Sequence, residues 1–257
     1  MNLQTDLKSL RVEAPHGLVD SVLVAVGLAD MYAVRPGPLG NVFVAFNTRG
    51  VSALDLAESA TDFERRFAAI YGRTVVATAE IPDHIARQVD TAIREGRPGR
   101  LAVDLSGLSE FQQAVLRRTA TIPRGEVRPY GWIAKEIGKP GAVRAVGTAL
   151  AQNPIPVIIP CHRVVRSDGT LGKYSLGADA NKRVLLEIEG LDVGEFERQA
   201  GRGVRFIGSD TTRIFCHPTC RNARRISTAH RIEFRSEAAA EGAGYRACLV
   251  CRPAQAA

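Results

Sequence analysis

The sequence predicts an α+β protein made of more than one folded unit. Short apolar runs between Gly/Pro-rich turns indicate strands early in the chain, and apolar residues at helical spacing indicate helices after them. Four of the five cysteines cluster near the C-terminus, which indicates a separate small domain. A chain of 257 residues with 45% hydrophobic residues is long enough to form one large domain or two to three smaller ones.

The first part of the chain reads as antiparallel strands followed by helices. Residues 21–27 (SVLVAVG) and 40–54 (GNVFVAFNTRGVSAL) predict strands, with the Gly/Pro-rich turn RPGPLGN between them. We expect one α+β domain over residues 1–100. Its two helices are predicted over residues 61–72, capped by Thr61 or Asp62, and over residues 82–96, after Pro82.

The second part reads as a helical domain over residues 106–195. The segment GWIAKEIGKPGAVRAVGTALAQN predicts two short helices, because the proline and glycines of GKPG end the first helix before the second begins. This pattern fits a DNA-binding helix-turn-helix and an ordinary helical hairpin equally well. The remaining predictions are a linker at 97–108, a helix at 110–122 capped by Ser109, a helix at 181–190 and a second linker at 197–204.

Composition narrows the class of protein. Residues 1–10 have no apolar signal-peptide core and no segment is long and apolar enough to span a membrane, so we expect a cytoplasmic protein without a membrane partner. The net charge of +7 and a pI near 9.5 favour a polyanionic partner such as nucleic acid. An odd number of cysteines without a signal peptide argues against a disulfide framework.

Cys161 stands apart from the other cysteines in the segment QNPIPVIIPCHRVV. Three prolines exclude a long helix, so residues 157–159 are expected to be buried, extended and able to hold Cys161 in a rigid turn. A free thiol is only a few per cent ionised at neutral pH, and His162 and Arg163 offer an adjacent base and an adjacent positive charge. The segment by itself leaves two interpretations open, a nucleophile with its base and an inert buried thiol.

The other four cysteines form the pattern C-x3-C, 27 residues (221–247) and C-x2-C. Two close pairs of soft ligands are typical of a tetrahedral zinc site. His217 could replace one of the cysteines as a ligand, although its position between Cys216 and Pro218 makes it the weaker candidate. The sequence therefore predicts one Zn²⁺ site with the ligands Cys216, Cys220, Cys248 and Cys251.

Residues 108–190 resemble the O6-alkylguanine-DNA alkyltransferases. The resemblance lies in FQQAVLRRTATIPRGEV, YGWIAKEIG, RAVGTALAQNPIPV, IPCHRVV, GKYS and LLEIEG, which occur in the family's order. It implies a winged-helix-like, DNA-binding alkyltransferase domain over residues 106–195. Strand pattern and position also make residues 1–100 resemble the family's ribonuclease-H-like N-terminal domain.

This resemblance implies a role for each matching residue. Cys161 would take the alkyl group from guanine O6 and keep it as a thioether, so that each molecule reacts once. His162 would accept the thiol proton through a water molecule, and Glu189 would orient and charge that imidazole. The other implied roles are Asn153 holding the turn, Tyr130 donating to the purine, and Tyr174 with Ser175 closing over the flipped base.

The implied partner is double-stranded DNA, bound through the minor groove by a protein that we expect to be a monomer. Arg144 matches the family's arginine finger, which fills the space left by the flipped base, although a solvated arginine on a helix is the commoner case. Small residues around it would allow close approach to a narrow groove. They are Gly141, Ala142, Ala145, Gly147 and Ala149.

The segment TTRIFCHPTCRNARR…CLVC resembles the zinc domain of the bacterial Ada protein, here over residues 205–254. The resemblance implies that Cys216 is both a zinc ligand and a second acceptor, which takes methyl groups from DNA phosphotriesters. Methylation would change the formal charge of the site from about −2 to about −1 and strengthen DNA binding. Nearby basic residues that would benefit are Arg221, Arg224, Arg225, Arg231 and Arg235.

Several departures from these families keep other interpretations open. Pro129 stands where the alkyltransferases usually have serine, and Trp132 stands at a commonly polar position. The zinc domain follows the alkyltransferase domain instead of preceding it, and the segment before it is short enough to lack the usual N-terminal helix, so a purely structural zinc site remains possible. The alternatives to an alkyltransferase are a non-catalytic binder of alkylated DNA, a methylation-sensing transcription regulator and a cysteine hydrolase. No organic cofactor and no AraC-like regulatory module are expected.

Overall fold

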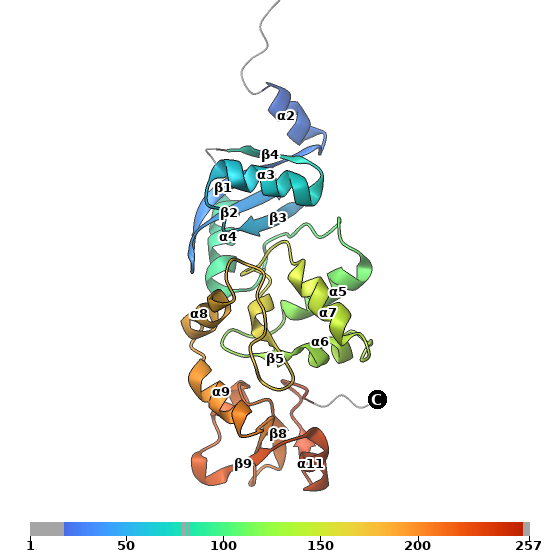
Figure 1. The fold of residues 1–257 in the computed structure, drawn as a ribbon, viewed down its shortest axis with the longest axis vertical. Coiled ribbons are helices and arrows are strands. Elements are labelled where there is room, and N and C mark those ends of the chain that lie inside the picture. Colours follow the sequence, from blue (N-terminus) through green and yellow to red (C-terminus); the bar gives the residue numbers. More distant parts are fainter. Residues whose placement is uncertain (1–17, 79–80, 82, 254–257) are drawn as a thin grey trace, which may run out of the picture.

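The computed structural model describes residues 18–78, 81 and 83–253, and it has three folded parts in chain order along one elongated molecule (Figure 1). An N-terminal sheet with helices is followed by a helical part and then by a small domain that holds the cysteine cluster. The predicted α+β class is confirmed at this level. Among the described residues, no helix is long and apolar enough to cross a membrane. The predicted absence of a signal peptide at residues 1–10 and the predicted helix start at Pro82 lie outside the described residues.

The N-terminal part is a four-stranded sheet of order β3-β2-β1-β4. The two pairings among β1, β2 and β3 are antiparallel, whereas β4 pairs parallel with β1. Ser59 caps α3, because its side chain accepts a hydrogen bond from the Asp62 backbone N–H; the predicted caps Thr61 and Asp62 are therefore wrong. The elements are α2 (Leu18–Ala25), β1 (Ala29–Gly37), β2 (Gly40–Asn47), β3 (Gly50–Asp55), α3 (Ala60–Tyr71), β4 (Thr74–Ala77) and α4 (Asp83–Glu95).

The strand predicted at residues 21–27 is wrong, since these residues belong mostly to helix α2. All residues of α2 lie outside the core, and the first strand of the sheet begins after it, at Ala29. A short continuous apolar run has no periodicity that separates a strand from a helix, so the sequence pattern could not decide between them. The strand at residues 40–54 is confirmed, divided into β2 and β3.

The middle part is mainly helical and carries the predicted pair of short helices. Ser109 caps α5 in a complete capping box with Gln112, as predicted for that serine. The chain leaves α6 through Gly138 with a positive φ of 71°, and α7 begins after the GKPG turn. The elements are α5 (Glu110–Thr119), β5 (Arg128–Pro129), α6 (Tyr130–Glu136), α7 (Val143–Ala151), the 3-10 helix η1 (Cys161–Arg163), β6 (Val164–Val165) and α8 (Ala180–Ile188).

The C-terminal part is built on a four-stranded sheet of order β10-β8-β7-β9. The linker predicted at residues 197–204 is wrong over most of its length, because α9 continues to Gly201 and buries Phe196 and Gln199. Arg198 and Gly201 lie in the last turn of that helix, and Arg202 is its C-cap residue. The elements are α9 (Val193–Gly201), β7 (Phe206–Ser209), β8 (Ile214–Cys216), α10 (Arg221–Arg224), the 3-10 helix η2 (Thr228–His230), β9 (Arg231–Phe234), α11 (Glu237–Gly242) and β10 (Arg246–Ala247).

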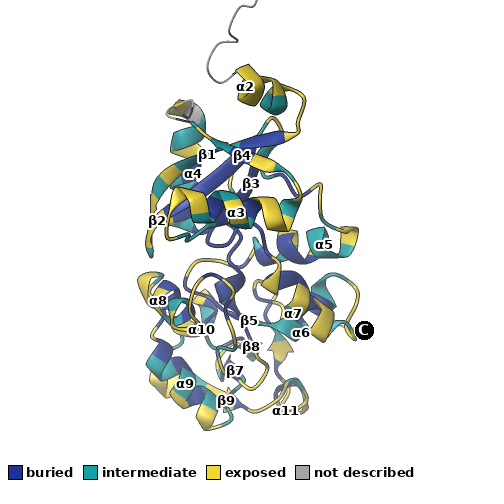
Figure 2. Ribbon diagram, turned by 45° about the horizontal axis from the view of Figure 1, so that its top comes forward, coloured by how far each residue is buried: buried dark blue, intermediate teal, exposed yellow. Residues whose placement is uncertain are grey.

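One continuous core joins the N-terminal sheet to the helical part, and Figure 2 shows buried segments on both sides of this junction. Leu101 and Leu105, in the segment predicted as a linker, are buried in that core. The Leu54 backbone N–H donates to the Pro154 carbonyl at 2.8 Å, which ties β3 to the segment leading to Cys161. The first part therefore supports the Cys161 turn directly.

Candidate active site and metal-binding site

The turn that carries Cys161 is closed by the side chain of Asn153. Its Nδ2 donates to the Ile159 carbonyl at 2.8 Å, and its Oδ1 accepts from the Ile155 backbone N–H at 3.1 Å. Residues 157–159 are buried as predicted, but they form a tight turn and not an extended segment, since Val157 has a φ of 71°. The two bonds to Asn153 hold that turn, and Cys161 begins the 3-10 helix that follows.

The Cys161 thiol is 5% exposed and lies among polar groups. Burial raises its pKa, while the Asn153 side chain and the charge of Lys182 act in the opposite direction. Lys182 is itself buried, its Nζ donates to the Val164 carbonyl at 2.6 Å, and burial lowers its pKa to about 8. Lys182 is not among the predicted site residues, because in the sequence it is only a lysine within the amphipathic pattern of residues 181–190.

His162 is held by Glu189, the C-cap residue that follows α8. The distance between His162 Nε2 and Glu189 Oε1 is 2.9 Å. Burial lowers the pKa of His162 more than Glu189 raises it, so the imidazole is neutral at pH 7. Its other nitrogen, Nδ1, is buried without a hydrogen-bond partner among the described residues. The geometry leaves this one ring nitrogen free to accept a proton.

Arg163 does not serve the thiol as the sequence analysis expected. Its guanidinium binds the Glu189 carboxylate, with Nη2 to Oε1 at 2.6 Å and Nε to Oε2 at 2.9 Å, and Nη1 donates to the Ile122 carbonyl. Although burial raises the pKa of Glu189, hydrogen bonds from His162 and Arg163 lower it to about 2. The positive charge that acts on Cys161 is that of Lys182, because the helix α8 packs against the turn.

Two tyrosines lie near the thiol. Tyr130 begins α6, Lys182 Nζ lies 6.0 Å from its ring centre, and burial raises the pKa of its phenol. Tyr174 is buried edge-on against the His162 ring at 6.3 Å, and burial likewise raises its pKa. Both phenols are therefore protonated at neutral pH. Ser175, next to Tyr174, is exposed.

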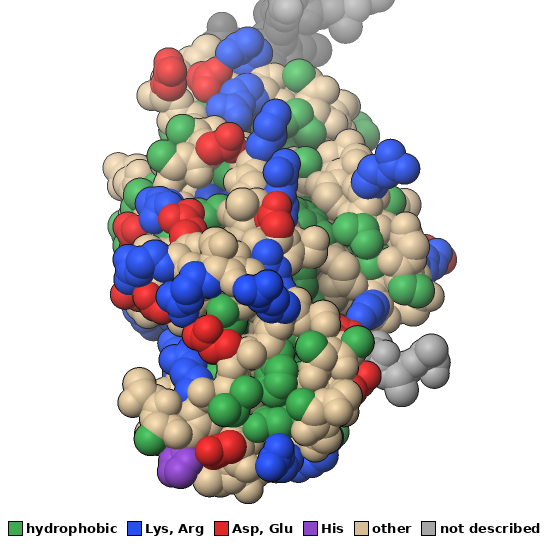
Figure 3. All heavy atoms as spheres, turned by 60° about the horizontal axis from the view of Figure 1, so that its bottom comes forward, with side chains coloured by type: hydrophobic (Ala, Val, Ile, Leu, Met, Phe, Trp, Pro, Cys, Tyr) green, Lys and Arg blue, Asp and Glu red, His purple; other side chains and the backbone are tan. Residues whose placement is uncertain are grey.

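The helix α7 has a slim outer face. Arg144 and Ala145 are exposed, while Val146, Ala149 and Leu150 pack inward. Gly147 is partly exposed and faces Tyr130; a Cβ at this position would lie 4.0 Å from Tyr130 Cε1. Elsewhere, Figure 3 shows Lys and Arg side chains in a band across the middle of one face of the molecule, with Asp and Glu side chains among them.

Four cysteines of the C-terminal part come together as predicted. Their sulfur atoms all lie within 4.8 Å of one another, and all four residues are buried. Tetrahedral thiolate ligands around Zn²⁺ at 2.3 Å would lie about 3.8 Å apart, so the cluster is compatible with one zinc ion. Cys216 is the last residue of β8, Cys220 lies in the segment after it, and Cys248 and Cys251 follow β10. The four residues are Cys216, Cys220, Cys248 and Cys251.

His217 is not part of this cluster. Its ring lies against Phe206 with ring centres 5.5 Å apart, and its Nε2 is buried without a hydrogen-bond partner among the described residues. The possibility that it replaces a cysteine ligand is therefore not supported. The sequence separation of one residue from Cys216 turns its side chain to the other side of the strand end.

Only part of the cluster faces a surface cavity of about 540 Å³. Cys216 and Cys248 line it, together with the basic side chains of Arg225 and Arg246 and the hydroxyl of Thr211. Cys248 Sγ accepts a hydrogen bond from Asn222 Nδ2 at 3.5 Å. Of the two cysteines that line the cavity, Cys216 is the one whose sulfur does not accept the hydrogen bond from Asn222.

Comparisons with known proteins agree with this division. Residues 110–191 match the family described as "6-O-methylguanine DNA methyltransferase, DNA binding domain", and residues 196–254 match "Metal binding domain of Ada". The second match begins inside α9. A helix, whose presence the short preceding segment had left open, therefore lies at the start of the matched region.

Individual relatives cover different shares of the chain. The bifunctional transcriptional activator/DNA repair enzyme Ada of Escherichia coli (strain K12) is 36% identical over 160 residues, which are 62% of this chain and 45% of that protein. The methylated-DNA--protein-cysteine methyltransferase of Methanosarcina barkeri is 37% identical over 159 residues, 62% of this chain and 96% of that protein. The chain spans about half the length of the other curated relatives first matched.

The fold comparison covers the same region. The crystal structure of Mycobacterium tuberculosis OGT in complex with DNA matches with a TM-score of 0.51 and 31% sequence identity, over 65% of this chain and 99% of that one. The part of the chain that contains Cys161 thus matches nearly the whole length of one curated methyltransferase and of one solved structure. On this basis the chain belongs to the methylated-DNA--protein-cysteine methyltransferase family.

Proposed function

We propose that this protein repairs DNA by transferring an alkyl group from O6 of guanine to Cys161, once per molecule. The observation that carries the proposal is the arrangement of a buried thiol beside Lys182 and a neutral His162, which Glu189 holds by one nitrogen only. An inert buried thiol has no need of a charged lysine at its side, because burying that lysine costs free energy.

The reaction needs the thiol proton to leave before sulfur attacks. His162 Nδ1 accepts it through a water molecule, and Glu189 stabilises the resulting imidazolium. The thiolate then forms a bond to the alkyl carbon as the bond from that carbon to O6 breaks. The electron pair stays on the guanine, which takes a proton from the Tyr130 phenol. The thioether product is a poor leaving group, so the protein does not turn over.

The substrate is double-stranded DNA whose damaged base has left the helix, since O6 of a stacked guanine cannot reach a thiol that is 5% exposed. The exposed outer face of α7 suits the narrow minor groove, with Arg144 filling the place of the base. Ser175 closes over the base beside Tyr174. The net charge of +7 supports binding to a polyanion.

Two features of the fold, the order of the first sheet and the arrangement around α6 and α7, support the proposed function. The sheet order β3-β2-β1-β4, with β4 parallel to β1, supports a ribonuclease-H-like assignment of the first part. The α6–α7 pair lies between the two paired strands, β5 before it and β6 after it, and this arrangement supports a winged-helix-like assignment. We therefore propose domains over residues 1–100, 106–195 and 205–254.

The first experiment incubates the full chain with a duplex carrying one O6-methylguanine, measures the intact mass and maps the modified peptide. The proposal expects one added CH2 on the Cys161 peptide and an unmodified guanine in the DNA. The matched control is Cys161→Ser. Repeated turnover on esters or amides, or no modification of the Cys161 peptide, would reject the alkyltransferase in favour of the hydrolase or the non-catalytic binder.

The four-cysteine site is proposed to bind Zn²⁺ through all four sulfur atoms. Bound zinc would deprotonate its ligand thiols and leave a nucleophilic thiolate without a separate base. Cys216 is proposed as a second acceptor, for methyl groups on DNA phosphotriesters. It lines a cavity with Arg225 and Arg246, whose charges suit a phosphate backbone, and it lacks the amide donor that occupies Cys248.

Two measurements test these assignments. Zinc content of the full chain should fall from about one ion per molecule to near none when Cys248 and Cys251 are replaced by serine. An unchanged stoichiometry would refute the ligand set. Incubation with a duplex carrying one methyl phosphotriester should add CH2 to the Cys216 peptide; zinc binding without this modification would show a purely structural site.

A further inference from the structure

The loop 248–252, which carries two of the four cysteines, is attached to the middle part by the chain's single tryptophan. Trp132 is 6% exposed, and its Nε1 donates to the Cys251 carbonyl at 2.9 Å and to the Arg252 carbonyl at 3.1 Å. A buried indole N–H needs such an acceptor, and here both acceptors belong to the cysteine loop. The aromatic side chain at a commonly polar family position thus serves as the contact between two domains.

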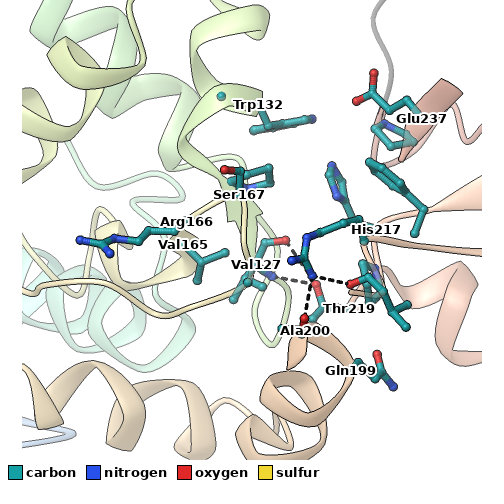
Figure 4. Close-up of a pocket in the computed structure, with 18 of the residues that line it drawn as sticks. Val127, Trp132, Val165, Arg166, Ser167, Gln199, Ala200, His217, Thr219 and Glu237 are labelled. Atoms are coloured by element: carbon teal, nitrogen blue, oxygen red, sulfur yellow. Dashed lines mark hydrogen bonds between the residues drawn. The ribbon is translucent and has the colours of Figure 1, made fainter. Parts of the chain in front are cut away.

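The first cysteine loop is attached as well. The Val127 backbone N–H donates to Thr219 Oγ1 at 2.9 Å, and the Arg221 N–H donates to Glu126 Oε1 at 2.9 Å. Thr219 and Arg221 flank Cys220 on both sides. Figure 4 shows Val127 and Trp132 of the middle part facing Thr219 and His217 of the cysteine domain. Both cysteine loops are therefore fixed to residues 126–132.

Residues 126–132 lead directly to the Cys161 site. β5 pairs with β6 through Arg128 with Val164, and β6 follows the 3-10 helix that begins at Cys161. Trp132 lies in the first turn of α6, two residues after Tyr130. A displacement of residues 126–132 would therefore move the proposed proton donor and the strand that supports the acceptor turn.

These contacts act as a few separate anchors and not as a continuous packed interface. A cavity of about 530 Å³ lies between the two parts, lined by Trp132 and His217 among others. At its side, Arg118 stacks on the Trp132 ring with 4.6 Å to its centre, and Arg252 binds Glu136 at 2.6 Å. With a cavity in place of packing, the position of α6 depends on these hydrogen bonds and charges.

We propose that Trp132 is a positioning residue that couples the four-cysteine site to the Cys161 site. An occupied metal site keeps loop 248–252 ordered. The hydrogen bonds from Trp132 to that loop then keep α6 and Tyr130 in position. Loss of the metal, or of the Trp132 N–H, therefore slows alkyl transfer to Cys161 about fivefold, at the low end of coupling between distinct sites. This inference rests on the proposed metal site and the proposed alkyl transfer.

The first test uses the fluorescence of the unmodified full chain, in which Trp132 is the only tryptophan. Zinc-loaded protein is titrated with a chelator while the emission spectrum is recorded. Release of loop 248–252 should expose the indole to water and shift its emission to longer wavelength, in step with zinc release. An emission spectrum that does not change while zinc leaves would overturn the proposal, and this test needs no substituted variant to fold.

The second test compares transfer rates with and without chelator in the unmodified chain and in Trp132→Phe, which keeps a ring but removes the N–H donor. Chelation should slow the unmodified chain about fivefold and the variant less than about twofold. Tyr71→Phe, an aromatic change in the N-terminal part, should keep the fivefold effect. If chelation slowed all three chains by the same factor, the coupling would be rejected while the proposed function would stand. A chain that binds no zinc or transfers nothing to Cys161 would instead reject the proposed function, and the coupling with it.

Discussion

His162 Nε2 and Glu189 Oε1 lie 2.9 Å apart, and this contact decides which imidazole nitrogen is available. The same carboxylate also binds the guanidinium of Arg163, so one buried acid orients the base and neutralises a buried cation. Glu189 thus has a chemical and a structural task. Its replacement should affect both, and the two effects can be measured separately.

Glu189→Gln should lower the rate of alkyl transfer about a hundredfold, because an amide orients the imidazole but does not stabilise its charged form. It should also destabilise the fold by about 3 kcal/mol, since Arg163 remains buried without its counter-charge. The transfer rate is measured at saturating DNA, and stability by urea unfolding. Glu187→Gln is the matched control, because Glu187 is half-exposed on the same helix. Equal losses in both variants would contradict the assigned role.

The transfer rate should be constant between about pH 6.5 and 8 and fall below that range, because the pKa of His162 lies below its ordinary value of 6.5. Only the neutral ring accepts the thiol proton. The measurement is the single-turnover rate at saturating DNA against pH. A rate that rises steadily from pH 6.5 to 8 would show that direct ionisation of the thiol, and not His162, controls the step.

The stability of the fold should depend on the same pair at lower pH. The pKa of Glu189 is about 2 in the folded chain and near 4.5 when unfolded, so its contribution is complete above pH 4.5 and is lost as pH falls toward 2. The contribution is about 3 kcal/mol. Comparing urea unfolding of the unmodified chain and Glu189→Gln at several pH values isolates it. A difference between the two chains that stays constant from pH 6 to pH 3 would contradict this assignment.

Lys182→Met should slow the reaction without weakening the fold. The lysine charge favours the Cys161 thiolate, so its removal should raise the pKa of that thiol and lower its reactivity about tenfold. Stability should stay equal or increase, because a buried charge is replaced by an apolar side chain. Iodoacetamide labelling of the Cys161 peptide at several pH values measures the thiol. Arg183→Met, at a partly exposed position of the same helix, should leave the labelling rate unchanged.

The sequence predicted those parts of the site that lie in short segments. Three prolines around Asn153 and Cys161 restrict the backbone, and the spacing of the C-terminal cysteines reflects the reach of two short loops around one ion. The resemblance then supplied Glu189 as a candidate. All of these residues lie where local geometry or a family motif fixes them.

The contacts between distant segments could not be predicted in this way. Lys182 reads as one more charge on an amphipathic helix, and only the packing of α8 on the Cys161 turn buries it. Trp132 reads as a departure from a family pattern until the cysteine domain folds onto α6 and provides acceptors for its N–H. The error at residues 21–27 has a different origin: a short apolar run has no periodicity that separates a helix from a strand, and α2 buries none of its residues.

Arg144→Ala should impair repair of duplex DNA much more than reaction with the isolated base. If Arg144 fills the place of the flipped guanine, its loss should lower the transfer rate from an O6-methylguanine duplex at least about tenfold, since base flipping costs a few kcal/mol. The rate with free O6-methylguanine should not change, because Arg144 is exposed on α7 while Cys161 lies in the buried turn. Arg65→Ala, at a highly exposed arginine of α3, serves as the control. Equal losses on duplex and free base would place Arg144 in the support of the acceptor site and not in DNA distortion.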